Sequence, residues 1–162
     1  MEQTTTPYST QLKELEELKD YVGKELGLTE WMTMEQERIN SFAEATEDMQ
    51  WIHTNPERSA AFSPYKKTVA HGFLVLSLAS KISYDAFSIE NVVMGVNYGL
   101  DKVRFPNATK SGAKLRGRVS LMEYDAIPGG AKYKMKIVFE LEGKEKPACV
   151  AEFLAMAYTM PA

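Results

Sequence analysis

A chain of 162 residues with 44% hydrophobic and 25% charged residues can build one domain with a real core, whereas two domains would each be small for their apolar content. The net charge of -3 gives no basic excess of the kind that nucleic-acid-binding domains usually show, so no nucleic-acid partner is expected. We therefore expect a single domain over residues 1–162.

The rest of the composition bears on compartment and cofactors. The one cysteine, Cys149, lies in an apolar run, which excludes a disulfide framework or a clustered thiolate metal site within one chain. The N-terminus lacks the basic start and apolar run of a signal peptide, and the longest apolar stretch, after Gly72, falls short of a membrane span. These features indicate a cytoplasmic protein with no membrane segment and no cofactor.

Apolar residues recur at helical spacing near the N-terminus, among Lys and Glu: Leu12, Leu15, Leu18, Tyr21 and Val22. This pattern predicts an amphipathic helix over about 9–25, closed by Gly27, within an N-terminal helical extension over about 1–28. Such a helix could bind a partner, but packing against the main body is the favoured interpretation at this length.

The next segment alternates briefly over 28–34, as a short strand does. Thr33 can then cap a helix over about 34–45, with Gln36 three residues later to complete a capping box. This helix would bring the chain to Asp48 from a packed element.

A third helix is predicted to begin at Asn55-Pro56, where Asn55 can cap and Pro56 can be the first helical residue. The segment 62–68 is irregular and could border a pocket. The segment over about 70–87 is apolar on most of its faces, which is typical of a helix that is buried nearly all round.

From Asn91 onward the sequence alternates with period two, which predicts strands. The expected strands are 92–99, 102–105, 114–124, 131–141 and 147–158. Turn signals at 128–130 and 142–144 make the last three an antiparallel meander. Helices followed by a sheet of four to six strands indicate an α+β domain, and only the helix after Gly72 is apolar enough for a long antiparallel sheet to wrap around.

Asp48 and His53 form the only acid–histidine pair that lies close together in an apparent loop between packed elements. Proton transfer requires one group to hold or polarise water and another to give or take a proton, and these two side chains meet that requirement. The alternative is a surface or capping aspartate beside a structural histidine. The residues by themselves leave both interpretations open.

His71-Gly72 opens the apolar helix and is the second candidate feature. Gly72 allows close approach of a ligand to the backbone, and the first amides of a helix point outward unpaired, which suits an oxyanion or a polarised carbonyl. Gly72 could equally relieve crowding against the sheet, and His71 could orient the turn. Three well-placed protein ligands for a metal are hard to find, so no metal is expected.

Two motifs in series carry a resemblance to a known family. FAEATEDMQWIHTNPER (42–58) followed by TVAHGFLVLSL (68–78) resembles the MaoC-like dehydratases, in particular their nodulation protein N-like branch, and NYGLDKVRFP (97–106) is similar to a strand entry of that branch. The resemblance runs from about Val22 to Tyr158. It implies a hot-dog fold, in which a curved antiparallel sheet surrounds a long central helix, and pairing into a homodimer through the sheets.

The resemblance also implies an activity. Members interconvert trans-2-enoyl and (R)-3-hydroxyacyl thioesters of coenzyme A or acyl carrier protein. The catalytic acid and histidine of the family fall on Asp48 and His53, and its oxyanion amide falls on Gly72. We expect the remaining substrate contacts from five further residues: Gln50, Lys67, Thr68, His71 and Arg104.

The chain departs from the family's hydratase motif, which commonly has Gly before the acid and Asn-Pro two and three residues after it. Here Glu47 precedes Asp48, and Gln50 and Trp51 follow; the latter two are usual in the nodulation-like branch. Glu47 could block the water or add negative charge. The rival functions are a non-catalytic acyl-thioester-binding protein silenced by Glu47 and an acyl-CoA thioesterase on the same fold.

Overall fold

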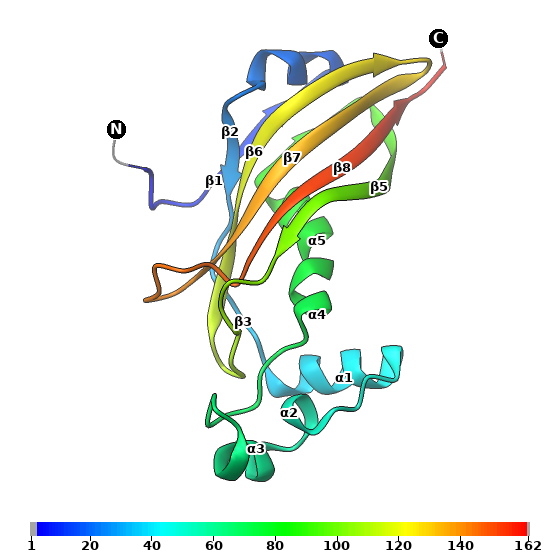
Figure 1. Ribbon diagram of the computed structural model, residues 1–162. Helices are drawn as coiled ribbons and strands as arrows, with labels where there is room; N and C mark the ends of the chain where they lie inside the picture. The colour runs from blue at the N-terminus through cyan, green and yellow to red at the C-terminus, as the bar shows by residue number, and fades with distance from the viewer. Residues whose placement is uncertain (1–2, 162) are drawn as a thin grey trace.

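A curved eight-stranded sheet surrounds one helical segment in the computed structural model of this protein, which describes residues 3–161 (Figure 1). The elements follow the chain in this order: β1 (Tyr8–Leu12), the 3-10 helix η1 (Leu15–Tyr21), β2 (Glu25–Leu28), β3 (Met32–Thr33), α1 (Gln36–Thr46), α2 (Trp51–Thr54), α3 (Pro56–Phe62), α4 (Gly72–Ser77), α5 (Ala79–Ala86), β4 (Phe87–Ile89), β5 (Val92–Arg104), β6 (Lys114–Ile127), β7 (Gly130–Leu141) and β8 (Cys149–Thr159).

The sheet has the strand order β4-β1-β2-β6-β7-β8-β5, with β3 paired to β6. The meander β6-β7-β8 is antiparallel as predicted, and its two turns contain Gly129 and Gly143 at φ 78° and 73°. The sheet differs from the expectation in two respects, both of which involve the strands β1–β4. The short strands β1–β4 raise the strand number above six, and β1 pairs with β4 in parallel, so the sheet is mixed.

The N-terminal amphipathic helix expected over about 9–25 is mostly replaced by other structure. Only Leu15–Tyr21 is helical, as η1, and β1 and β2 flank it. The leucines still face the core, because Leu12, Leu15 and Leu18 are all buried. Three buried positions at this spacing fit a strand end followed by a 3-10 turn as well as a helix, and sheet pairing of β1 with β2 and β4 decides between them.

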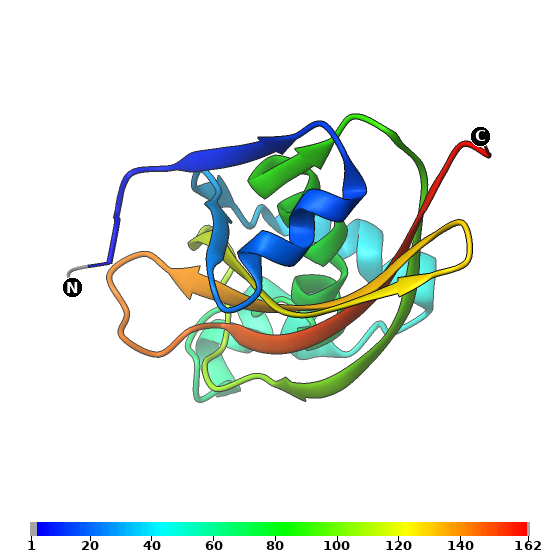
Figure 2. The ribbon, with the colours of Figure 1, turned by 90° about the horizontal axis from the view of Figure 1, so that it is seen from above.

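The central helix consists of α4 and α5, which are separated only by Leu78. Leu78 itself has helical backbone angles. The buried side chains of the central helix lie on several faces: Leu74, Val75, Ala79, Ile82 and Ala86. The sheet packs so closely that a Cβ on Gly117 would lie 2.1 Å from Ile82. This confirms the predicted wrapping, which Figure 2 shows from above. No helix within residues 3–161 combines the length and apolar character needed to cross a membrane.

Helices α1, α2 and α3 gather beyond one end of the sheet, beside the start of α4 (Figure 1). The predicted cap of α3 is confirmed, because the Asn55 side chain accepts a hydrogen bond of 2.9 Å from the Arg58 amide. The predicted Thr33 cap of α1 is wrong: the helix begins at Gln36 with Glu35 as its cap. The Gln36 side chain is used elsewhere, in the site described below.

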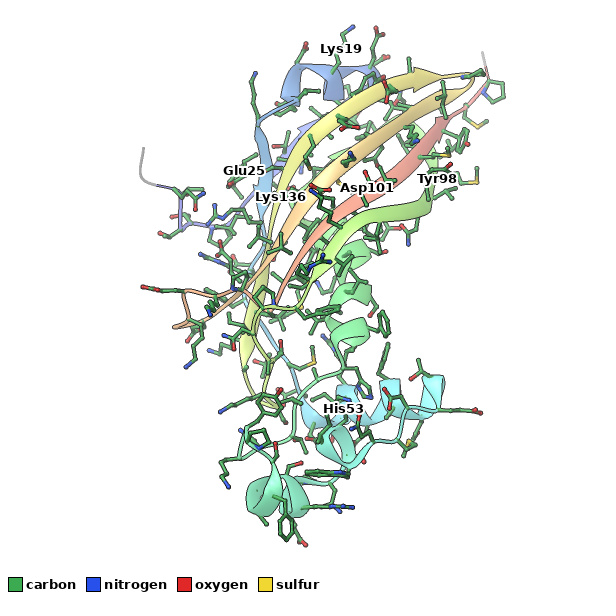
Figure 3. The ribbon with its side chains drawn as sticks, viewed as in Figure 1. Lys19, Glu25, His53, Tyr98, Asp101 and Lys136 are labelled. Carbon is green, nitrogen blue, oxygen red and sulfur yellow. The ribbon has the colours of Figure 1, made fainter. Side chains whose placement is uncertain are left out.

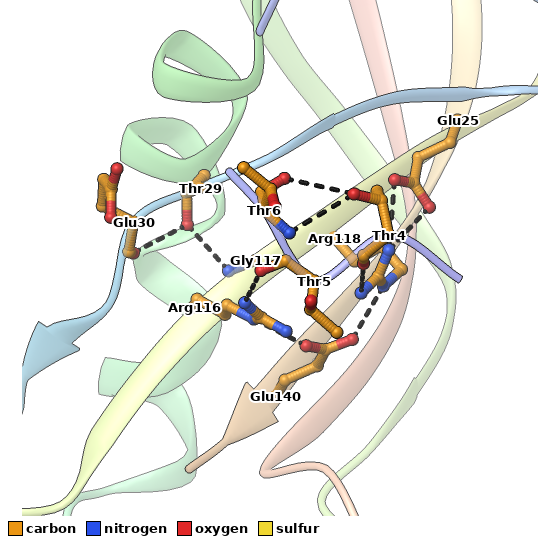
Figure 4. Close-up of polar contacts among 10 residues, drawn as sticks. All are labelled: Thr4, Thr5, Thr6, Glu25, Thr29, Glu30, Arg116, Gly117, Arg118 and Glu140. Carbon is orange, nitrogen blue, oxygen red and sulfur yellow. Dashed lines mark hydrogen bonds and ion pairs between the residues drawn. The ribbon is translucent and has the colours of Figure 1, made fainter. Parts of the chain in front are cut away.

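A polar network ties the N-terminal segment to the sheet (Figure 4). Glu140 accepts hydrogen bonds from Arg116 at 2.8 Å and from Arg118 at 2.7 Å, and Arg118 also pairs with Glu25. The two arginines donate further to the carbonyls of Thr5 and Thr4. Because both guanidinium groups are nearly buried, each needs these partners to offset its desolvation.

Candidate active site

His53 is the buried base candidate, located on the short helix α2 (Figure 3). Its side chain is 7% exposed, and Nδ1 lies 2.6 Å from the Val69 carbonyl oxygen. A carbonyl only accepts, so Nδ1 carries the proton and Nε2 keeps its lone pair. Burial lowers the His53 pKa below its ordinary 6.5, opposed by the Val69 hydrogen bond and reinforced by His71. The imidazole is therefore neutral at pH 7.

Asp48 follows the end of α1, and its side chain is 53% exposed. A carboxylate oxygen of Asp48, a ring nitrogen of His53 and a ring nitrogen of His71 all lie within 4.8 Å of one another. Two hydrogen bonds of about 2.8 Å that meet at a tetrahedral oxygen span about 4.6 Å. The separation of Asp48 and His53 therefore suits one shared water molecule better than a direct contact.

His71 connects these two residues. Its Nε2 lies 3.0 Å from the backbone carbonyl oxygen of Asp48 and 4.0 Å from the Asp48 carboxylate. Its ring stacks on the His53 ring with centroids 3.7 Å apart and an interplanar angle of 23°. Five positions separate Asp48 from His53 in the sequence, and the turn between α1 and α2 brings them together.

A cavity of about 220 Å³ adjoins His53 and the start of α4. Its lining comes from α2, the segment before α4, α4 itself and the loops that follow β5 and β7: Ile52, His53, Tyr65, Val69, Ala70, Gly72, Val75, Phe105, Asn107, Ala108, Thr109 and Ala148. Among residues 3–161 no hydrogen bond uses the Gly72 amide. A Cβ on Gly72 would lie 3.2 Å from the Phe105 ring, so close packing also favours glycine here.

Gln36 is a site residue that the sequence analysis missed. Its Nε2 donates to the His53 carbonyl at 2.7 Å, and its Oε1 accepts from the Thr68 hydroxyl. Gln36 thus joins the start of α1 to α2 and to the segment that carries Val69. Thr68 is buried with its hydroxyl engaged in this way, which places it as part of the scaffold. A glutamine three residues after Thr33 indicated a capping box, and no sequence signal pointed to His53.

Three other expected substrate contacts, Gln50, Lys67 and Arg104, lie on the surface. Gln50 is exposed, and its backbone carbonyl accepts from the His53 amide at 3.0 Å, so it shapes the turn that carries His53. Lys67 is exposed on the segment before α4. Arg104 ends β5 next to Phe105 of the cavity and donates to the Val103 carbonyl.

Asp48, His53 and His71 are also the group that could hold a metal ion. A zinc ion would lie about 2.1 Å from each ligand nitrogen and in the plane of each ring. The nearly parallel rings of His53 and His71, with centroids 3.7 Å apart, do not direct their lone pairs to one such point. The arrangement suits proton transfer better than metal coordination.

A larger hollow lies elsewhere. It measures about 590 Å³ and is lined in part by Trp31, Arg116 and Glu140. Arg116, Arg118 and Glu140 of its lining already pair with each other, as in Figure 4, and the residues of the predicted site do not line it. The smaller cavity at His53 is therefore the better candidate on chemical grounds.

Glu47 occupies the position at which α1 ends, with φ 61° and ψ 20°. This left-handed conformation favours glycine, because an L side chain places its Cβ against the following carbonyl. The side chain of Glu47 is exposed. The geometry gives a physical reason for the glycine that the family commonly has before its acid.

Replacing Glu47 by Gly should stabilise the protein by about 1 kcal/mol, since the strained backbone is relieved. For a chain of this size the melting temperature would rise by about 2–4 °C. Thermal and urea unfolding measure the change. Glu44→Gly is the matched control: Glu44 is also exposed but lies inside α1, where glycine should cost about 1 kcal/mol. Equal losses in both variants would contradict the strain at Glu47.

Comparison with known proteins agrees with this geometry. The model of the MaoC like domain matches residues 17–138, which is most of the chain. This chain belongs to the MaoC-like family. The family resemblance drawn from the sequence is thereby confirmed, and the protein is an enzyme of the hydratase and dehydratase class.

Two relatives and one solved structure show which known proteins this chain is similar to. The 3-hydroxyacyl-thioester dehydratase Z of Mycobacterium tuberculosis is 41% identical over 131 residues, covering 80% of this chain and 86% of that protein. Nodulation protein N of Rhizobium leguminosarum bv. viciae is 40% identical over 146 residues, covering 88% and 89%. The unliganded R-hydratase PhaJ1 of Pseudomonas aeruginosa superimposes with a TM-score of 0.69 at 19% identity, covering 86% and 83%, which confirms the hot-dog fold.

Proposed function

We propose that this MaoC-like protein adds water to trans-2-enoyl thioesters to form (R)-3-hydroxyacyl thioesters, and catalyses the reverse dehydration. The observation that carries the proposal is the convergence of a carboxylate oxygen of Asp48 and a ring nitrogen of His53 within 4.8 Å, beside the start of α4. The relatives named for 3-hydroxyacyl-thioester dehydration and R-hydration support this chemistry.

In the proposed reaction, water lies between Asp48 and His53. His53 accepts one proton at Nε2 while the water oxygen bonds to C3 of the substrate. The electron pair of the double bond moves to C2 and to the thioester oxygen, to which the Gly72 amide donates a hydrogen bond. C2 then takes up a proton on the same face, returned by His53 or relayed by Asp48, so no net proton is consumed.

The neutral state of His53 supports its role as the base. Burial lowers its pKa, and the hydrogen bond from Nδ1 to Val69 leaves Nε2 free to accept a proton. The exposed carboxylate of Asp48 can orient the water through its second hydrogen. The cavity beside Gly72 is largely apolar, with Ile52, Val75 and Phe105 in its lining, as an acyl chain requires.

Purified protein incubated with crotonyl-coenzyme A tests the function. Loss of the enoyl absorbance without release of thiol, with (R)-3-hydroxybutyryl-coenzyme A as the product, is the expected result. Loss of absorbance with free thiol would assign the protein as a thioesterase. Binding without turnover would assign it as a non-catalytic acyl-thioester-binding protein, and Glu47→Gly would then show whether Glu47 suppresses the chemistry.

The same assay addresses the carrier and the acyl chain. Lys67 and Arg104 are exposed cations on segments that border the cavity, and we place them as partners of a carrier phosphate. Charge removal at either residue should then raise KM and leave kcat nearly unchanged. Comparing coenzyme A with acyl carrier protein thioesters, over increasing acyl lengths, identifies the substrate.

We further propose that two copies pair through β5 and the adjoining face of α4 and α5. Within residues 3–161, β5 pairs only with β8, which leaves its other edge open over 13 residues. Large apolar side chains are exposed on these elements: Phe73, Tyr84, Val93, Met94, Val96, Tyr98 and Leu100. An open edge beside exposed apolar groups favours pairing with a second copy.

Tyr84→Glu should dissociate this dimer, because it places a charge on a side chain that is 79% exposed in one chain and would be covered in the pair. Light scattering after size-exclusion chromatography should give twice the chain mass for the wild type and about one chain mass for the variant. Val22→Glu is the matched control, since Val22 is exposed on the bridge beside η1, away from β5. Dissociation by Val22→Glu alone would place the interface elsewhere.

A further inference from the structure

His71 occupies a position from which it reaches all three proposed catalytic groups. It is the residue that caps α4, so Gly72 with its free amide is the next residue in the chain. Its carbonyl accepts the first hydrogen bond of that helix, from the Val75 amide at 3.2 Å. A displacement of His71 therefore moves the start of α4 together with the Gly72 amide.

The two ring nitrogens of His71 differ in their hydrogen bonding. Nε2 lies 3.0 Å from the Asp48 carbonyl oxygen and must donate to it, because a carbonyl only accepts. In the neutral ring Nδ1 then has no proton, and it is buried with no partner among residues 3–161. A buried ring nitrogen without a partner is uncommon in a folded protein and requires an explanation.

The His71 ring packs against two other aromatic rings. One contact is the stacked ring of His53, and Phe42 of α1 lies at a centroid distance of 5.0 Å. The side chain is 3% exposed and does not line the cavity beside His53. A substrate in that cavity can reach His53 and Gly72 without touching His71.

We infer that His71 is a positioning residue, which holds the Asp48 backbone through Nε2–H and supports the His53 ring by stacking, so that both groups face one water molecule. The inference rests on the proposed function, and it assigns to His71 a role other than the substrate contact expected from the sequence. Misplacement of catalytic groups by about 1 Å can cost about 10²-fold in rate, so the support has kinetic consequences.

The charge state of His53 provides a second readout. The titratable groups that act on His53 are His71 at the start of α4 and Asp48 between α1 and α2, and Tyr65 lines the same cavity. Burial lowers the His53 pKa most, and the neighbouring His71 lowers it further. Removal of the His71 imidazole should therefore move the acid limb of the rate profile to higher pH.

Three replacements of His71 separate its two contacts. The amide nitrogen of Gln lies as many bonds from the backbone as Nε2 and can still donate to Asp48, whereas that of Asn reaches only the Nδ1 position. Phe keeps a stacked ring but has no donor. In the crotonyl-coenzyme A assay, His71→Asn and His71→Phe should lower kcat about 10–100-fold with KM changed less than threefold, and His71→Gln should recover most of the rate. His71→Phe should also raise the pH of the acid limb.

The outcomes distinguish this inference from the proposed function. Equal rates for the Gln and Asn variants, or a rise in KM alone, would overturn positioning while hydration by the wild type stands. Long-range ¹H–¹⁵N correlation spectra of the wild type test the arrangement whatever its activity: the proton should be on Nε2 of His71 and on Nδ1 of His53. A proton on Nδ1 of His71 would overturn the inference, and an inactive wild type with the expected tautomers would overturn only the function.

Discussion

His53→Asn should lower kcat/KM for enoyl-thioester hydration by about 10²–10⁴, the usual contribution of a general base. The replacement is chosen because the amide nitrogen of Asn lies near the position of Nδ1 and can still donate to the Val69 carbonyl. The Nε2 lone pair is lost, together with the ring that stacks on His71. The fold and the cavity should remain, so a loss of rate reports on the base itself.

Steady-state kinetics with crotonyl-coenzyme A and urea unfolding together check this prediction. The free energy of unfolding should change by no more than about 1 kcal/mol, because the buried hydrogen bond to Val69 is kept. A variant with full activity would remove His53 from the mechanism. A variant that is inactive because it unfolds would be recognised by its lost stability, and His53→Gln would then be the second test.

The wild-type pH profile should also report on His53. Since burial lowers its pKa below 6.5, the imidazole stays neutral through pH 7 and becomes protonated only in more acidic solution. The rate should therefore hold constant near neutrality and fall as the pH drops below the ordinary histidine pKa. An acid limb above pH 6.5 that persists in His53→Asn would assign the titration to another group.

Asp48→Asn is the second change with a large expected effect. Asn keeps the size of the side chain but replaces one acceptor oxygen with a donor, so it can no longer accept a hydrogen from the shared water at both positions. The rate should fall by about 10²–10⁴. Stability should change little, because the Asp48 side chain is half-exposed and its backbone carbonyl still accepts from His71.

The matched control for Asp48→Asn is Glu47→Gln, which removes the neighbouring negative charge without touching the pair. Glu47 is exposed, and we expect its replacement to leave kcat/KM within a few-fold of the wild type. A large loss in Glu47→Gln with none in Asp48→Asn would show that the wrong carboxylate has been assigned. A gain in Glu47→Gln would show that Glu47 restrains the reaction.

Local patterns in the sequence account for much of the fold. Period-two alternation and the turn glycines Gly129 and Gly143 specify the meander β6-β7-β8, and the apolar run after Gly72 specifies the helix inside it. The N-terminal leucines show the limit of what such local patterns can predict. Their burial was predictable, but strand or helix depended on pairing with β4, more than 70 residues away.

The candidate site divides in the same way. The sequence by itself determined the chemical groups, an acid and a histidine next to a helix that begins with glycine, because these depend on residue types and on motifs in series. Only the tertiary structure decided that His71 stacks on His53, that Gln36 joins α1 to α2, and that Phe105 lines the cavity. Those contacts join residues 17–33 positions apart, and no local period encodes them, because they arise where packed elements meet.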